Sequence, residues 1–194
     1  MPPVRKGTPP RPPDPPPEPQ EPREPRDGPW VTAVPLVRAA QTGDALALGD
    51  LLDLLTPYVT RLCAPIARGD APDAVQEALI AVFRGIGRLH DPLALYGWVR
   101  VVTVREAVRV ARRAARETPV EHVDGLPPTA GPELSGDVHD VLRRMTPEHR
   151  AILVLRELEG LDEKAAGEVL NISRGTVRSR LHRARTSFRK AWTR

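Results

Sequence analysis

Apolar residues recur at spacings of three and four along most of the chain from about residue 33 onward. This spacing places them on one face of an α-helix. A first helix is expected before a break at 43–44, and the leucines of 46–55 predict a second. Pro57 can open a third, which ends near 69–70, because proline is tolerated in the first turn of a helix. The pattern therefore predicts an all-α fold.

The helix expected after residue 70 has one apolar face and one polar face. Its apolar stripe consists of Val75, Leu79, Val82, Phe83 and Ile86. The other side carries Asp73, Gln76 and Glu77. Such a helix buries the apolar stripe and leaves the acidic and amide side chains in solvent.

A long helix is expected over about 93–117, with two stripes of different character. The first stripe is apolar and contains Val101, Val104, Val108, Ala111 and Ala115. The second stripe lies on nearly the opposite side of the helix. It begins with an aromatic ring and continues as a ladder of guanidinium groups: Trp98, Val102, Arg105, Arg109, Arg112 and Arg116, with Arg113 beside it. Aromatic stacking combined with positive charge that follows a backbone is what single-stranded DNA binding requires. On periodicity alone, a core anchor at Trp98 with solvated arginines is an equally good interpretation.

The stretch 162–185 reads as a helix-turn-helix. Asp162 can cap a first helix that ends near Leu170, residues 171–172 form the turn, and Ser173 can cap a second helix. The core face of the second helix is expected at Val177, Leu181, Ala184 and Phe188. Its other side carries Thr176, Arg178, Ser179, His182 and Arg183.

Residues 174–194 contain eight Lys or Arg and no Asp or Glu. An uncompensated basic helix after a tight turn suits the major groove of DNA, where arginines pair with phosphates and guanines. The residues predicted to contact DNA there are Arg174, Thr176, Arg178, Ser179, Arg180 and Arg183.

Composition divides the chain of 194 residues into four segments. Residues 1–30 form a tail that is expected to be disordered, since 13 of the 23 prolines lie within the first 29 residues. Residues 31–117 and 137–194 are expected to form two small helical domains. Between them, 118–136 contain four prolines and three glycines and predict a flexible linker. The net charge is only +4, but the pI of about 9.8 and the basic C-terminal end point toward nucleic acid.

Motifs for catalysis and metal binding are not found in the sequence. The five histidines lie far apart, and Cys63 is the only cysteine, so neither a disulfide nor a cysteine-based zinc site is expected. There is no glycine-rich phosphate loop of the P-loop or dinucleotide-binding type. We therefore expect no enzyme activity, no cofactor and no metal. No apolar run is long enough to span a bilayer and no signal peptide is evident, so we expect a cytoplasmic protein without membrane insertion.

The C-terminal part resembles a known family. LRRMTPEHRAILVLRELEGL, followed by the turn and by ISRGTVRSRLHRAR, is similar to region 4 of the extracytoplasmic-function sigma factors, which direct bacterial RNA polymerase to promoters. The family usually has a Glu and an Ile where this chain has Ala165 and Ala166. Smaller residues on the inner face of that helix are expected to loosen its packing.

Residues of the N-terminal domain resemble region 2 of the same family, over PLVRAAQTGDALALGDLLDLLTPYVTRLCAPIARGDAPDAVQEALIAVF and YGWVRVVTVREAVRVARR. DAVQE stands where the family has its polymerase-binding helix, and Trp98 stands where the family has a tryptophan beside the −10 element. The chain departs from the family at Arg105 and Arg109, where an Asn and an Asp are common, and at Leu48, where a Phe is common.

The resemblance implies a promoter-recognition subunit of bacterial RNA polymerase. It implies that core RNA polymerase binds at Asp73, Gln76 and Glu77, and that −35 promoter DNA binds along the last helix. Promoter opening at −10 would use Trp98, Arg105, Arg109, Arg112, Arg113 and Arg116. An inhibitory anti-sigma factor is a further expected partner. Two alternatives remain open from the residues alone: a helix-turn-helix regulator that binds DNA without polymerase, and a degenerate chain that sequesters partners.

Overall fold

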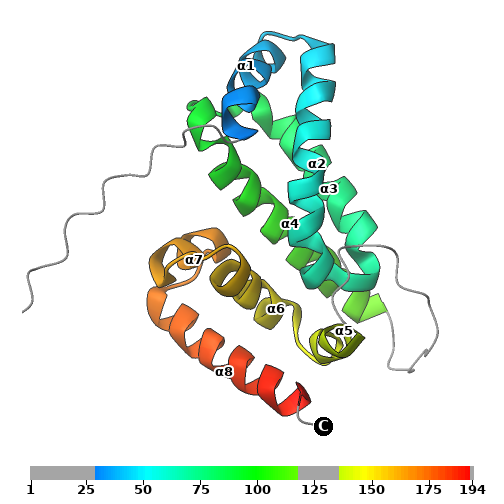
Figure 1. The fold of residues 1–194 in the computed structure, drawn as a ribbon, viewed down its shortest axis with the longest axis vertical. Helices are drawn as coiled ribbons and strands as arrows, with labels where there is room; N and C mark the ends of the chain where they lie inside the picture. The colour runs from blue at the N-terminus through cyan, green and yellow to red at the C-terminus, as the bar shows by residue number, and fades with distance from the viewer. Residues whose placement is uncertain (1–28, 118–135, 193–194) are drawn as a thin grey trace, which may run out of the picture.

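A computed structural model of the chain describes residues 29–117 and 136–192, and every regular element within these ranges is helical (Figure 1). The all-α prediction is therefore confirmed. The predicted tail and linker lie outside the described residues, except that α1 begins at residue 29 and α5 at residue 136. The elements in chain order are α1 (Pro29–Gln41), α2 (Ala45–Ala67), η1 (Arg68–Asp70), α3 (Ala71–Gly85), η2 (Ile86–Arg88), η3 (Pro92–Ala94), α4 (Leu95–Glu117), α5 (Gly136–Arg143), α6 (Pro147–Leu153), η4 (Val154–Leu158), α7 (Glu163–Leu170) and α8 (Arg174–Trp192).

Helices α1 to α4 form an N-terminal bundle, drawn from blue to green in Figure 1. Helices α2, α3 and α4 contact one another, and α1 packs against α2. Side chains from three of these helices, including Leu55, Val82 and Val99, have no exposed surface. Removing such aliphatic side chains from water is the main force that holds the bundle together, at about 1.5–3 kcal/mol for each large side chain.

The expectation that Pro57 opens a separate helix is wrong. Helix α2 runs through Pro57 without interruption. Proline lacks the N–H that would bond to the preceding turn, which costs about 3 kcal/mol in a helix interior. Here Pro57 lies on the solvent side, while the buried face continues past it at Leu51, Leu55, Val59 and Leu62. Burial of this continuous stripe outweighs the local preference of proline.

Helices α5 to α8 form a C-terminal region in which the starts of α7 and α8 follow the sequence prediction. The Asp162 carboxylate accepts a hydrogen bond of 2.7 Å from the Ala165 N–H and begins α7. The Ser173 hydroxyl accepts one of 3.2 Å from the Thr176 N–H and begins α8. Thr146 likewise caps α6 by accepting from the His149 N–H at 3.3 Å. Each cap satisfies an amide that has no partner inside its helix.

The tight turn between α7 and α8 depends on two residues. Asn171 adopts a left-handed conformation, with φ 52° and ψ 51°, which asparagine tolerates better than most residues. At Gly167 a Cβ atom would lie 2.8 Å from the carbonyl oxygen of Ile172. Glycine therefore allows the turn to fold closely against α7 and fixes the angle at which α8 leaves it.

The N-terminal bundle and the C-terminal region pack against each other. Helix α4 contacts both α6 and α7, and α2 contacts α6. The buried apolar residues of both parts belong to one continuous cluster. In Figure 1 the C-terminal region lies against the lower half of the bundle, with α6 and α7 facing α4. The described residues thus adopt one closed arrangement.

Candidate nucleic-acid interface

Helix α8 buries the face that the sequence predicts. Val177 and Ala184 are fully buried, Leu181 is nearly so, and Phe188 packs against the same cluster. The opposite face presents the residues predicted to contact DNA, of which Arg174, Thr176, Arg178, Ser179 and Arg183 are exposed and Arg180 is partly exposed. Helix α8 therefore has the form of a recognition helix, with one face anchored and one face free for a groove of DNA.

The arginines of α8 are less free of acidic partners than the sequence suggests. Glu163 at the start of α7 accepts hydrogen bonds from Arg174 at 3.1 Å and from Arg178 at 3.0 Å. Arg185 pairs with Glu157 at 2.8 Å. The prediction of an uncompensated basic helix is wrong in this respect, because the compensating carboxylates come from neighbouring elements. Hydrogen bonds from Arg178 and then Arg174 lower the pKa of Glu163 to about 2.

The arginines of α4 lie on one exposed face of the helix, as their spacing in the sequence predicts. Arg105, Arg109, Arg112, Arg113 and Arg116 are all exposed. All five line a groove of about 640 Å³ between α4 and the C-terminal region, to which Arg180 of α8 also contributes. The structure therefore brings the predicted −10 arginines together, and it places one predicted −35 residue beside them.

Trp98 does not line this groove, and the structure separates it from the arginine ladder. The indole is partly buried and packs against the hydrophobic core. It lies against the end of α3, where a Cβ atom on Gly85 would come within 2.6 Å of the Trp98 Cζ2 atom. The indole is thus anchored against α3 while the residue keeps partial exposure, and its role at the −10 element stays a prediction.

Three of the α4 arginines already have partners in the closed arrangement. Arg105 donates to the main-chain carbonyls of Val169 at 2.9 Å and Glu168 at 3.2 Å, at the end of α7. Arg112 pairs with Glu148 of α6. Arg109 remains within the bundle and pairs with Glu106 at 2.6 Å and Glu77 at 3.0 Å. The C-terminal region therefore occupies part of the surface that is predicted to bind promoter DNA.

The residues predicted to bind core polymerase lie on α3. Asp73 and Gln76 are exposed, and Glu77 is partly covered by its ion pair with Arg109. The apolar stripe of this helix is rotated from the predicted one. Ala74, Ala78 and Val82 form the buried face, and Phe83 is 53% exposed, so its expected burial is wrong. The buried residues are spaced four apart from position 74. Phe83 follows Val82 by one residue, so its side chain points beside the core rather than into it.

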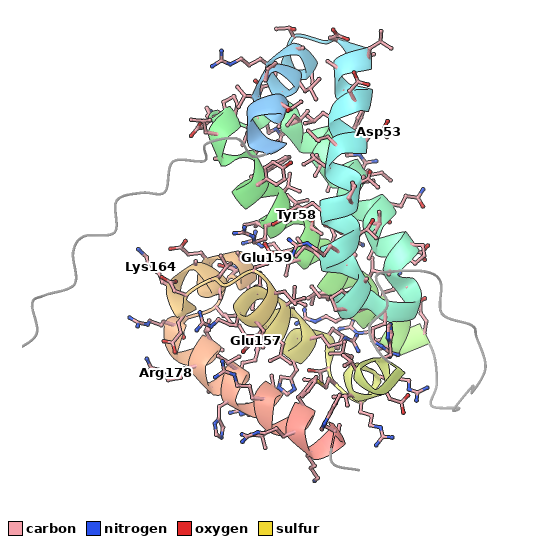
Figure 2. The ribbon with its side chains drawn as sticks, viewed as in Figure 1. Asp53, Tyr58, Glu157, Glu159, Lys164 and Arg178 are labelled. Carbon is pink, nitrogen blue, oxygen red and sulfur yellow. The ribbon has the colours of Figure 1, made fainter. Side chains whose placement is uncertain are left out.

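A buried polar contact between the two parts has no counterpart in the sequence analysis. The Glu159 carboxylate, whose side chain is 4% exposed, accepts from three groups of the bundle. These are the Tyr58 hydroxyl at 2.8 Å, the Arg61 guanidinium at 2.7 Å and the Arg100 Nε at 2.8 Å. Figure 2 labels Glu159 and one of its partners, Tyr58. Burial, with help from the hydrogen bond to Glu159, raises the pKa of Tyr58 to about 12. We refer to these four residues as the Glu159 cluster.

Arg150 of α6 makes a second contact that was not predicted. Its side chain is buried and donates to three main-chain carbonyls, those of Ile66 at 2.7 Å, Met145 at 2.9 Å and Leu142 at 3.2 Å. Ile66 belongs to α2, so this guanidinium joins the two parts of the chain. Burial, together with the nearby charge of Arg68, lowers the pKa of Arg150 to about 10.

Comparison with known proteins identifies the family. Residues 135–188 match the family model "Sigma-70, region 4". Over 172 residues the chain is 30% identical to the ECF RNA polymerase sigma-E factor of Escherichia coli (strain K12), covering 79% of this chain and 90% of that protein. The chain belongs to the ECF RNA polymerase sigma factor family. The relationship confirms the resemblance found in the sequence and does not favour the interpretation as an independent regulator.

Other relatives agree with this assignment. The sigma factor is 29% identical to the ECF RNA polymerase sigma-E factor of Haemophilus influenzae over 174 residues, covering 80% of this chain and 92% of that protein. It is 33% identical over 164 residues to ECF RNA polymerase sigma factor SigE of Mycolicibacterium smegmatis, covering 76% of this chain but only 63% of that protein.

Two solved structures share the fold of this sigma factor. CnrH, solved in complex with the cytosolic domain of CnrY, matches with a TM-score of 0.55 at 21% identity, over 81% of this chain and 95% of CnrH. The sigma factor RpoE from Bartonella quintana, solved with the anti-sigma factor NepR, matches with a TM-score of 0.56 at 20% identity, over 75% of this chain and 96% of that chain.

Among the described residues, no helix is long and apolar enough to cross a membrane.

Proposed function

We propose that this sigma factor directs core RNA polymerase to promoters through two separate basic helices. Helix α8 contacts the −35 element and the exposed face of α4 acts at the −10 element. The observation that supports this division is the anchoring of each helix on one face, with the predicted DNA-contacting arginines exposed on the other. Neither face carries a group of residues arranged for catalysis, and we propose that the chain is not an enzyme.

At the −35 element, the proposed contacts are made by the N-terminal half of α8. The side chains of Thr176 and Ser179 can reach base edges, while Arg178 and Arg183 pair with phosphate or guanine. Arg174 and Arg178 must exchange Glu163 for DNA when they bind. The side chains of Arg174 and Arg178 are 69% and 70% exposed and that of Glu163 is 22% exposed, so water screens these ion pairs and their loss costs little against the gain of a phosphate contact.

At the −10 element, the arginine face of α4 is proposed to hold the backbone of the opened strand. The exposed part of Trp98 supplies an apolar surface at the head of the same helix. A base that stacks on an aromatic ring gains about 1–3 kcal/mol. We propose that Trp98 stabilises the opened promoter in this way while its other side remains against Gly85.

Promoter binding requires the two parts of the chain to separate. Positions −35 and −10 are roughly 80 Å apart on duplex DNA, at about 3.4 Å per base pair along each strand. In the closed arrangement Arg180 of α8 and the arginines of α4 line one groove. While they line one groove, α4 and α8 cannot contact the −10 and −35 elements at the same time. We infer that the closed arrangement is a free state, and that binding to core polymerase or DNA opens it.

The proposed surface for core polymerase is the polar face of α3 around Asp73 and Gln76, where neither residue contributes to the buried face. An anti-sigma factor is a second proposed partner, supported by the shared fold with CnrH and RpoE, both solved with a partner protein. Because polymerase and promoters are its sites of action, we propose a cytoplasmic location.

Co-purification with core polymerase tests the polymerase contact. We expect the Asp73→Ala, Gln76→Ala double variant to keep its helical circular dichroism and melting temperature but to lose co-purification. The matched control is Asp50→Ala, Asp53→Ala, which changes two exposed residues of α2. Retained co-purification by the α3 variant, or equal loss by the control, would refute the assignment.

A further inference from the structure

The groove between α4 and the C-terminal region carries more positive charge than its own carboxylates neutralise. It measures about 640 Å³ and is lined by six arginines but only two glutamates, together with three apolar residues.

The six arginines fall into two groups. Three have partners: Arg105 bonds to carbonyls of α7, Arg109 to Glu77 and Glu106, and Arg112 to Glu148. The remaining three, Arg113, Arg116 and Arg180, make no direct hydrogen bond or ion pair with another described residue, although the charge of Arg113 also acts on the nearby Asp70 carboxyl. Two of these come from α4 and one from α8, so cations without a direct partner among the described residues line the groove from both parts of the chain.

The groove also has an apolar component. Val104 and Val108 of α4 and Leu170 of α7 lie among the lining residues. A volume of this size is within the range of about 300–1,000 Å³ in which proteins bind small molecules. Guanidinium groups bind phosphate with paired, charge-assisted hydrogen bonds, and they do so better than lysine because of their planar fork.

We propose that this groove binds a small anion with several adjacent phosphates, held between Arg113 and Arg116 of α4 and Arg180 of α8. Such an anion neutralises charges contributed by both parts of the chain. It therefore binds the closed arrangement more tightly than the open one and shifts the chain toward closure as its concentration rises, up to the ratio of the two affinities. The proposal concerns the free chain and does not depend on the role of α4 in promoter opening.

Two sources of such an anion differ in how they use the groove. An inorganic polyphosphate uses the arginines alone. A nucleoside polyphosphate also places its base and sugar against Val104, Val108 and Leu170. Inorganic tripolyphosphate and ATP, both without magnesium, separate these cases because they carry similar phosphate chains.

Isothermal titration calorimetry of the full chain at fixed ionic strength provides the test. We expect measurable binding of tripolyphosphate. Arg180→Gln should weaken it about tenfold, and the double variant Arg113→Gln, Arg116→Gln by at least as much, as lost charge-assisted bonds would. The matched control is Arg183→Gln, which removes one charge from the same helix outside the groove and should change affinity less than twofold. These exposed or partly exposed residues can be changed without opening the core, which circular dichroism verifies.

Three outcomes would overturn the proposal. The first is no binding of either probe by the unaltered chain at millimolar concentration. The second is equal weakening by Arg180→Gln and Arg183→Gln, which would show general attraction to a basic helix. The third is weakening by the α4 double variant alone, which would place the anion on α4 without the C-terminal region. Tighter binding of ATP than of tripolyphosphate assigns the site to a nucleotide, and equal binding assigns it to an inorganic polyphosphate.

Discussion

The carboxylate of Glu159, in the C-terminal region, lies 2.8 Å from the Nε of Arg100 on α4 and is almost completely buried. This ion pair, with Tyr58 and Arg61 on the same carboxylate, joins the two parts of the chain. The Glu159 side chain is 4% exposed, whereas those of Arg100 and Arg61 are 23% and 49% exposed. Water therefore screens the arginines in part, and removing the Glu159 charge is expected to cost less than the about 3–5 kcal/mol of a fully buried pair.

Glu159→Gln is therefore expected to favour the open arrangement. Small-angle X-ray scattering should show a larger radius of gyration than for the unaltered chain. The matched control is Glu157→Gln, which removes a half-exposed glutamate two residues away whose partner, Arg185, lies within the C-terminal region. The control should leave the radius unchanged. An unchanged radius for Glu159→Gln would show that the Glu159 cluster does not hold the parts together.

Glu163 restrains the two arginines that begin the −35 surface. Glu163→Gln should strengthen binding of holoenzyme to promoter DNA by about two- to fivefold, because Arg174 and Arg178 no longer have to leave a carboxylate. Arg178→Ala should weaken binding and reduce the dependence of log K on log salt by about one unit if the contact is to phosphate. Fluorescence anisotropy over a salt series measures both. Weaker binding by Glu163→Gln would contradict the competition.

The contact between Trp98 and Gly85 is tight enough to be tested by one methyl group. Gly85→Ala places a Cβ atom 2.6 Å from the indole, so the ring must move. We expect a lower melting temperature and an altered tryptophan emission spectrum. Gly87→Ala is the control, because a Cβ at that position meets no atom within 4 Å. Equal effects of the two substitutions would show that the ring is not anchored against α3.

Trp98→Ala should cost roughly 2 kcal/mol of stability, less than a fully buried tryptophan, because the ring is only partly covered. It should also reduce open-complex formation, measured by permanganate reactivity of unpaired thymines at a temperature where the variant is folded. A pre-melted promoter bubble should restore much of the loss. A bubble that restores nothing would leave Trp98 with a packing role alone.

His149 reports on the positive charge around Arg180. Burial, followed by the charge of Arg180, lowers its pKa below the ordinary histidine value. The folded chain therefore binds this proton less tightly than the unfolded chain. The contribution of neutral His149 to the free energy of unfolding is therefore complete above about pH 6.5, and it is lost as the pH falls below that value. In an NMR titration, Arg180→Gln should raise the pKa of His149, and Arg178→Gln should leave it unchanged. A pKa that does not respond to Arg180 would contradict the charge relationship.

Local features of this fold were predictable because they depend on neighbouring residues. The caps at Asp162 and Ser173 and the buried face of α8 follow from spacing and side-chain chemistry alone. Pro57 and Phe83 were misjudged because tertiary packing decided between local options. The Glu159 cluster and the Arg150 contact join residues far apart in the chain. A single glutamate in a polar stretch gives no sign of its partners, so only the structure reveals them.

The positions assigned to DNA and polymerase remain predictions, because the relatives establish the family and not the role of each residue. Ala165 and Ala166 illustrate the difference. Ala166 is fully buried, as expected for the inner face of α7.

Run-off transcription with purified core polymerase on a library of linear promoters tests whether the chain acts as the promoter-recognition subunit. We expect transcripts with defined starts that require both the chain and core polymerase. We also expect these transcripts to decrease strongly when Arg178 and Arg183 of α8 are replaced by alanine, or when Arg113 and Arg116 of α4 are. Specific binding of a DNA site by the chain alone, without any transcript when core polymerase is added, would contradict this role.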